Sequence, residues 1–296
     1  MDIEKIIDTY CSEHAESKKA NIRNWFIQIE KMANGVPLEE CFRLKEFLLK
    51  CFFTSKTSTV SRSQYQRIKE ILLYIFDCCN IDKTIIPSRD EVIESSQMCG
   101  FFADLHSALC FVDEIGNNTI AGYNPTTGLV RLKSIVILTW LGFTPSEMVE
   151  LVRSDIKVGN IIYIQKGNEQ IEISKDLFKI LSLQAEQDGV MTFPRGRIYA
   201  YKIETEYLIK NRVGEPMIPD HLHHLFKQFN EYANGLSVLS FKGLQISSLF
   251  AKIREDKSSE DLYTKIQKHA HCDKRVSYGY KKLYSQWSKK FFNEEI

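Results

Sequence analysis

The sequence predicts a mainly α-helical protein with a small β-sheet, divided into two domains. Hydrophobic residues recur every three or four positions over most of the chain, which is the spacing of amphipathic helices. A short alternating stretch, Ile161 to Ile164, is followed by turn residues and a second alternating stretch, as in a β-hairpin. With 296 residues and 44% hydrophobic content, the chain exceeds what one compact domain usually holds.

Residues 1–84 are expected to form a bundle of four amphipathic helices. Helically spaced apolar residues occupy the segments 3–10, 22–32, 41–51 and 65–76. Pro87 and the charged residues around it indicate a linker over residues 85–98. The second domain would then comprise residues 99–296.

The second domain begins with helical patterns over residues 101–115 and 130–141. Thr144, Pro145 and Glu147 have the spacing of a capping box, in which Thr is the N-cap, Pro stands at N1 and Glu stands at N3. We therefore expect a helix to begin at Thr144.

A hairpin is expected to follow this helix. The alternating strand at Ile161–Ile164 leads to the turn Lys166–Asn168 and the returning strand Gln170–Ser174, which places Lys166 at the tip. A helix N-terminus that faces a basic hairpin would suit a phosphate group. We expect a further helix over 175–187 and mostly helical segments after it.

Charge and cysteine usage restrict the function classes. The formal net charge is +1, so nucleic-acid binding must rest on local clusters of cations. The eight cysteines include no Cys-x-x-Cys pair, which is typical of reduced thiols in a cytosol. The N-terminus does not have the profile of a signal peptide, and the longest apolar run is too short to span a bilayer. We expect a cytoplasmic protein.

Several histidines are possible metal ligands by residue type. Their positions lack the tight paired spacing of structural zinc sites, and we expect neither a metal nor a cofactor. The group concerned is His221, His223, His224, His269, His271 and Cys272.

A segment rich in hydroxyl groups and cations is a candidate phosphate site in the first domain. No acidic residue lies between Glu46 and Glu70. Hydroxyl groups beside cations commonly hold phosphate oxygens. The candidate residues are Lys56, Ser58, Thr59, Ser61, Arg62 and Arg67. The alternative is a polar loop that caps the helix carrying Tyr65, with Ser61 or Ser63 as the N-cap.

The stretch Gly142-Phe143-Thr144-Pro145-Ser146-Glu147, followed by Ser154-Asp155-Ile156, resembles the core of the tyrosine recombinases, or phage integrases. That family has Gly-Leu-Arg-x-Ser-Glu after an apolar helix, and then an Asp-Ile or Asp-Val pair that leads into a hairpin. Thr144 stands where the family has its first catalytic arginine, and Lys166 matches the hairpin lysine.

The resemblance continues near the C-terminus. Lys242 and Gln245 replace the histidine and the arginine of the family's His-x-x-Arg motif, while His271 and Tyr280 keep the family spacing of nine residues. The resemblance implies a two-domain architecture, with an N-terminal helical core-binding-like domain and an integrase catalytic-like domain that clamp DNA between them.

The departures from the family pattern predict a protein that is not an enzyme. In the tyrosine recombinases, two arginines bind the oxygens of the scissile phosphate in the transition state. Thr144 and Gln245 are neutral and cannot replace them. Each missing contact would reduce the stabilisation of the transition state by about 3 kcal/mol. The loss of both would slow the reaction on the order of 10⁴-fold. The positions treated as degenerate, with no catalytic role, are Thr144, Lys166, Lys242, Gln245, His271 and Tyr280.

Alternatives stay open for several of these residues. His271 could be a polar residue at a helix junction, and Tyr280 could pack with Tyr278 and Tyr284 on one face of a helix. A divergent active recombinase would use Tyr280 as its nucleophile, with Lys242 and Arg275 as substitute cations. A module that binds another protein instead of DNA is a third class.

The expected partner is double-stranded DNA at operator-like sites. Contacts from the second domain are expected from Lys166, Arg195, Arg197, Lys242, Gln245, His271, Lys274 and Arg275. The amphipathic C-terminal helix could pack on its own domain or on a second copy, and a regulatory protein or peptide could also bind. In general character the chain is similar to the integrase-fold master repressors of SPβ-type Bacillus prophages, which implies a prophage transcriptional repressor that controls lysogeny.

Overall fold

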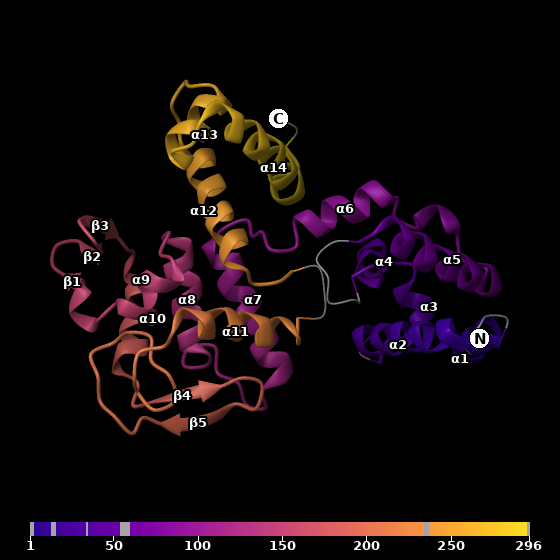
Figure 1. The fold of residues 1–296 in the computed structure, drawn as a ribbon, viewed down its shortest axis with the longest axis horizontal. Coiled ribbons are helices and arrows are strands. Elements are labelled where there is room, and N and C mark those ends of the chain that lie inside the picture. Colours follow the sequence, from indigo (N-terminus) through magenta and orange to yellow (C-terminus); the bar gives the residue numbers. More distant parts are fainter. Residues whose placement is uncertain (1–2, 13–15, 34, 54–59, 234–236, 295–296) are drawn as a thin grey trace. The chain divides into compact units, whose positions relative to one another are not determined.

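A computed structural model describes residues 3–12, 16–33, 35–53, 60–233 and 237–294. The chain divides into two compact units: the first comprises Met1–Cys99 and Asn234–Ser237, and the second comprises Gly100–Ala233 and Val238–Ile296. The elements are mostly helices, with two small antiparallel sheets (Figure 1). The predicted mainly α-helical class with a small sheet is confirmed.

The first unit consists of helices. They are α1 (Ile3–Ser12), α2 (Glu16–Ala33), α3 (Leu38–Cys41), α4 (Lys45–Cys51), α5 (Arg62–Cys79), the 3-10 turn η1 (Lys83–Ile85) and α6 (Arg89–Gln97). Buried aromatic and aliphatic side chains form its core, and the Trp25 indole donates a hydrogen bond to the Cys51 carbonyl at 2.9 Å. Helix α6, which a Ser88–Glu91 capping box starts, occupies most of the segment 85–98 that we expected to be a linker.

The second unit holds the remaining elements. The first part consists of α7 (Leu105–Thr119), α8 (Val130–Trp140), α9 (Pro145–Glu150), η2 (Arg153–Asp155), β1 (Ile156–Val158), β2 (Ile162–Lys166), β3 (Glu169–Glu172) and α10 (Lys175–Glu186). The second part consists of β4 (Gly189–Thr192), β5 (Arg197–Ala200), α11 (Pro219–Asn230), α12 (Phe241–Glu255), α13 (Leu262–Ala270) and α14 (Lys274–Phe292).

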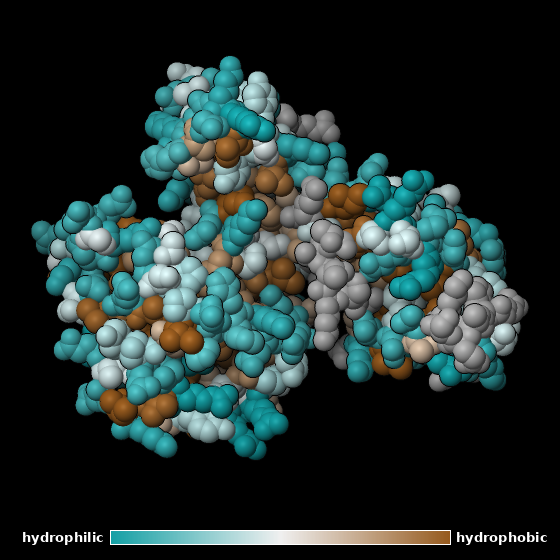
Figure 2. All heavy atoms as spheres, viewed as in Figure 1, coloured by the Kyte–Doolittle hydropathy of each residue, from teal (hydrophilic) through white to brown (hydrophobic). Residues whose placement is uncertain are grey.

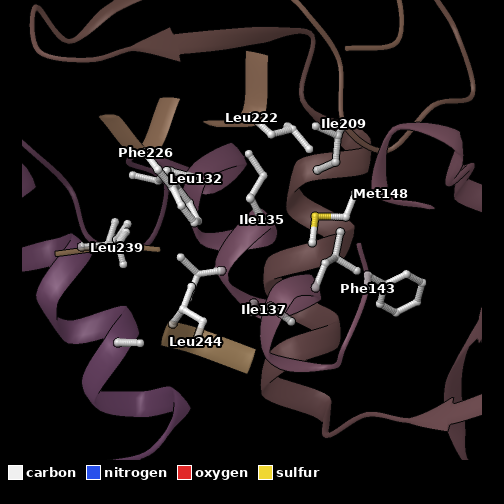
Figure 3. Close-up of a cluster of buried hydrophobic side chains, with 14 of the residues drawn as sticks. Leu132, Ile135, Ile137, Phe143, Met148, Ile209, Leu222, Phe226, Leu239 and Leu244 are labelled. Atoms are coloured by element: carbon white, nitrogen blue, oxygen red, sulfur yellow. The ribbon is translucent and has the colours of Figure 1, made fainter. Parts of the chain in front are cut away.

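Helix α8 is the centre of the second unit. Nine of its residues are buried, six of them apolar and three polar or charged (Lys133, Ser134 and Thr139), because neighbouring helices cover it. Figure 3 shows side chains from α8, α9, α11 and α12 converging on one cluster. The labelled members are Leu132, Ile135, Ile137, Phe143, Met148, Ile209, Leu222, Phe226, Leu239 and Leu244.

The predicted hairpin is present, with one more strand than expected. Strands β2 and β3 pair in antiparallel register, with Lys166 opposite Glu169. Strand β1 adds to β2 by pairing Lys157 with Tyr163. The sequence analysis predicted only the two strands of the hairpin and no strand over the residues of β1.

A second hairpin, β4–β5, lies in a region that we expected to be mostly helical, and that expectation is wrong. Val190 and Thr192 point into the unit, while every residue of β5 is exposed. The turn between the strands contains Gly196 at φ +62°, a conformation that favours glycine. Strands of four residues are too short for their alternation to stand out in the sequence.

Helices α12, α13 and α14 follow one another at one end of the second unit (Figure 1). Trp287 of α14 is fully buried, and its indole donates a hydrogen bond to the Phe102 carbonyl at 2.8 Å. The C-terminal helix therefore packs on its own unit. Self-association stays a prediction.

Patches of hydrophobic residues interrupt the mostly hydrophilic surface (Figure 2). Val158, Ile161 and Ile198 are among the exposed large hydrophobic residues. Within the described residues, no helix has both the length and the hydrophobicity to cross a lipid bilayer.

Candidate nucleic-acid interface

The turn between α8 and α9 is where the predicted site residues meet. Gly142 adopts φ +92°, which reverses the chain after α8. The Thr144 hydroxyl accepts a hydrogen bond from the Glu147 amide at 3.3 Å, and the Glu147 carboxylate accepts one from the Thr144 amide at 2.6 Å. The predicted capping box is confirmed. These side chains satisfy the amides of Thr144 and Glu147, and the role of this helix end as a phosphate site stays a prediction.

Lys166 holds this turn from the hairpin. Its Nζ donates a hydrogen bond to the Gly142 carbonyl at 2.8 Å and lies 3.8 Å from Oε2 of Glu147. The same ammonium lies 5.4 Å from the centre of the Phe143 ring. The side chain is 23% exposed, so the ammonium contacts the turn while part of it faces solvent.

Gln245 reaches the same turn from α12. Its Nε2 donates a hydrogen bond to the Phe143 carbonyl at 3.4 Å, which joins residues 102 positions apart. Lys242 lies one helical turn earlier on α12 and is exposed. Thr144, Lys166 and Gln245, all chosen from the sequence as one site, are therefore brought together around residues 142–144.

The Glu147 carboxylate offsets part of the positive charge that Lys166 brings to the turn. Partial burial opposes ionisation, but hydrogen bonds from Thr144 and the charge of Lys166 outweigh it, and the pKa of the Glu147 carboxyl is lowered. The carboxylate is therefore ionised at neutral pH and competes with any external anion for Lys166. The sequence analysis assigned Glu147 to the helix cap and missed its ion pair with Lys166. Lys166 belongs to the hairpin, which only the folded structure places beside Glu147.

His271 and Tyr280 lie beyond the other end of α12. His271 is exposed and ends α13 in the left-handed conformation, with φ 47°. The Tyr280 ring contacts the buried Phe250 edge-on, at 6.4 Å between ring centres. Among the described residues, no hydrogen bond or ion pair links either side chain to the turn at 142–144.

The three tyrosines of α14 have different environments. Tyr284 is buried, Tyr280 is partly exposed, and Tyr278 is 55% exposed, with its ring 5.0 Å from that of Tyr263. Tyr280 and Tyr284 both contact Phe250 edge-on, so the alternative of a shared packing face holds for these two and not for Tyr278.

The remaining predicted cations of the second unit are on its surface. Arg195 and Arg197 lie at the β4–β5 turn, and Lys274 and Arg275 open α14. All four are exposed.

In the first unit, Ser61 is the N-cap of α5 and accepts a hydrogen bond from the Gln64 amide at 3.1 Å. This confirms the capping alternative for Ser61. Arg62 and Arg67 are exposed on α5, where their contact with phosphate stays a prediction. Lys56, Ser58 and Thr59 lie outside the described residues.

One polar cluster was not foreseen. Asp256, after α12, accepts a hydrogen bond from the Ser258 amide at 2.9 Å and lies 2.8 Å from Nε2 of His269. Lys268 lies 3.6 Å from the same carboxylate. Hydrogen bonds from Ser258 and His269, with the nearby charge of Lys268, hold the pKa of Asp256 well below its usual range. This cluster ties α13 to the end of α12.

Among known proteins, the chain resembles solved structures. No family model and no curated protein sequence matches the chain. The structure of XerA recombinase is 12% identical, with 98% of this chain and 96% of that chain covered and a TM-score of 0.44. A lambda integrase dimer bound to a COC′ core site is 12% identical, with 94% of each chain covered and a TM-score of 0.38. The Tn1549 transposon integrase in complex with a circular intermediate DNA is 12% identical, with 93% of each chain covered and a TM-score of 0.38.

These comparisons contradict the expectation that the protein is not an enzyme, because each of the three structures is that of a recombinase or an integrase.

Proposed function

We propose that this protein binds specific sites on double-stranded DNA with a two-domain architecture like that of the tyrosine recombinases. The observation that carries the proposal is the meeting of Thr144, Lys166 and Gln245 at one turn. The family pattern aligns these three positions, far apart in the sequence, with residues that hold DNA phosphate. Their convergence supports the alignment independently of the motifs.

Phosphate contacts would come from groups that have free donors around this turn. Lys242 is exposed one helical turn from Gln245, and Lys166 has N–H donors beyond the one that it gives to Gly142. Lys274 and Arg275 would add charge from α14. Such contacts orient a protein on the duplex and make affinity depend on salt, while base contacts supply specificity.

Arg62 and Arg67 on α5 would contribute contacts from the first domain, whose limits we place at residues 1–84.

In this proposal the protein acts in a bacterial cytoplasm as a prophage repressor and blocks transcription by occupying promoters.

Selection of duplexes from a random-sequence library by the purified full chain tests the proposal. A shared sequence among the bound duplexes, and its footprint in a prophage regulatory region, are the expected results. Lys242→Met should weaken binding to the selected duplex, whereas Lys227→Met, which removes an exposed lysine of α11, should not. Failure to enrich any sequence would contradict the proposal.

A divergent tyrosine recombinase is a second candidate, favoured by the partial exposure of Tyr280. Its hydroxyl would attack the scissile phosphorus, form a 3′-phosphotyrosine and release the 5′-hydroxyl of the other DNA fragment. Incubation with a nicked suicide duplex would then trap a covalent adduct. The adduct should disappear in Tyr280→Phe and persist in Tyr278→Phe. The candidate fails if no adduct forms on the selected duplex.

A further inference from the structure

Strand β5 is an edge strand with one open side. It pairs with β4 alone, in a sheet of two strands. All four of its residues are exposed, and Figure 1 shows the strand at the lower border of the second unit. The open edge of a strand presents a row of backbone donors and acceptors with which another chain can pair.

The register of the hairpin shows which backbone groups of β5 face this open edge. The Tyr201 amide donates to the Asp188 carbonyl at 2.8 Å, which continues the pairing of β4 with β5 by one residue. In an antiparallel pair, successive residues of a strand alternate between bonding to the partner strand and pointing away from it. Tyr199 therefore bonds to β4, and the amides and carbonyls of Ile198 and Ala200 point to the open edge.

Apolar side chains gather at the same edge. Ile198 is 72% exposed, the highest fraction among the exposed large hydrophobic residues that the structure describes. Tyr199 is exposed next to it, and the guanidinium of Arg212 lies 5.3 Å from the centre of the Tyr199 ring. The carbonyl of Val213 accepts from the Ile203 amide at 3.0 Å, and both of these side chains are exposed too. Single exposed apolar side chains are ordinary, whereas a group of them beside an open strand indicates a contact surface.

The edge is also basic. Arg195, Arg197 and Lys202 are exposed along the strand and its ends, and Arg212 adds a fourth exposed cation. Residues 189–203 contain no aspartate or glutamate. Within the described part of the chain, none of the four cations belongs to an ion pair. Their charge is therefore available to an acidic partner.

The charges and the backbone edge favour one of three kinds of occupant. A second copy that used the same edge would bring like charges together, which opposes such pairing. DNA phosphates accept hydrogen bonds but cannot donate to the open carbonyls of Ile198 and Ala200, and they gain nothing from the Ile198 side chain. An extended polypeptide has both donors and acceptors, and carboxylates on it would balance the cations.

We propose that β5 is the docking site for an acidic, extended segment of a partner protein, which joins the sheet as a third strand. Backbone groups of Ile198 and Ala200 would bond to that segment, and the Ile198 side chain would pack on one of its apolar residues. Carboxylates of the segment would pair with Arg197 and Arg212. The proposal goes beyond the DNA-binding function and does not depend on it.

Selection from a displayed library of random short peptides by the purified full chain tests the docking site. The expected result is enrichment of peptides in which acidic and apolar residues alternate, because successive side chains of a strand point to opposite faces. A synthetic peptide from the enriched set then serves as the probe in fluorescence anisotropy titrations. Failure to enrich such peptides would contradict the proposal.

Two variants of the strand locate the binding of the probe. Ile198→Pro removes an amide that points to the open edge and leaves the bonds to β4, a position where an edge strand tolerates proline. It should weaken binding of the probe at least about tenfold, whereas Ile198→Val, which keeps the amide and the apolar surface, should bind like the parent. Arg197→Gln leaves the backbone unchanged and should weaken binding and its dependence on salt.

Three results would overturn the proposal. The first is equal affinity for the probe in the parent, Ile198→Pro and Arg197→Gln. The second is loss of binding to a short duplex in Arg197→Gln with no change in binding of the probe, which would assign the edge to DNA. The third is a dimer in sedimentation experiments that Ile198→Pro abolishes while the probe does not bind, which would assign the edge to a second copy.

Discussion

Replacing Lys166 by methionine separates two roles of this side chain, which holds the turn before α9 and is also expected to contact DNA phosphate. Methionine keeps the apolar stem beside Phe143 but removes the donor to Gly142 at 2.8 Å and the charge 3.8 Å from Glu147. The substitution therefore changes the polar contacts while preserving most of the packing.

The structure sets the size of each effect. Loss of a hydrogen bond from a charged donor costs about 1.5–3 kcal/mol, and the longer ion pair adds less than about 0.5 kcal/mol. If Lys166 also contacts one phosphate, the slope of log affinity against log salt should fall by about 0.9. Between 50 and 200 mM salt, the affinity ratio of parent to variant would then shrink about 3.5-fold.

Urea unfolding measures the first effect, and titration of a selected duplex at several salt concentrations measures the second. Lys227→Met is the control for loss of one positive charge at an exposed site. A loss of stability with an unchanged salt slope would show that Lys166 only supports the turn, and would refute its assignment to the DNA interface.

Three further outcomes are expected. Thr144→Ala should lower the free energy of unfolding by about 1 kcal/mol through loss of the cap, whereas Ser146→Ala, at an exposed position on the same helix, should leave it within error in urea unfolding. Leu244→Ala should cost about 2–5 kcal/mol by the same measurement, because this side chain is fully buried between α12 and α8; a cost below about 1 kcal/mol would contradict this packing. Asp256 has a folded-state pKa below its ordinary 3.8, so its stabilisation is present above about pH 4 and is lost as the pH falls through the lower folded value. Asp256→Asn should therefore lower Tm at pH 7 and reduce the fall in Tm on acidification, and parallel Tm profiles of parent and variant would disprove the linkage.

Local features were predictable where neighbours in the sequence carry the interaction. The capping box of α9 needs only Thr144, Pro145 and Glu147, which lie within one helical turn. Ser61 caps α5 by the same short-range chemistry. The β2–β3 hairpin was predictable because its turn residues stand between two alternating stretches.

Non-local contacts were not predictable in the same way. The four-residue strands β4 and β5 are stabilised by pairing with each other, and their sequence contains too few alternations to distinguish them. The hydrogen bond from Gln245 to the Phe143 carbonyl is likewise invisible in the sequence, because the two residues lie 102 positions apart and meet only after folding.

The sequence by itself determined the mainly helical class, the start of α9 and the set of residues worth comparing with a recombinase site, because these follow from periodicity, capping and spacing along the chain. Only the tertiary structure decided that Lys166 and Gln245 both hold the turn at Gly142 and Phe143, and that His271 and Tyr280 make no hydrogen bond or ion pair to that turn within the described residues. The physical reason is that donors and acceptors distant in sequence meet only when packing of the helices around α8 brings their elements together.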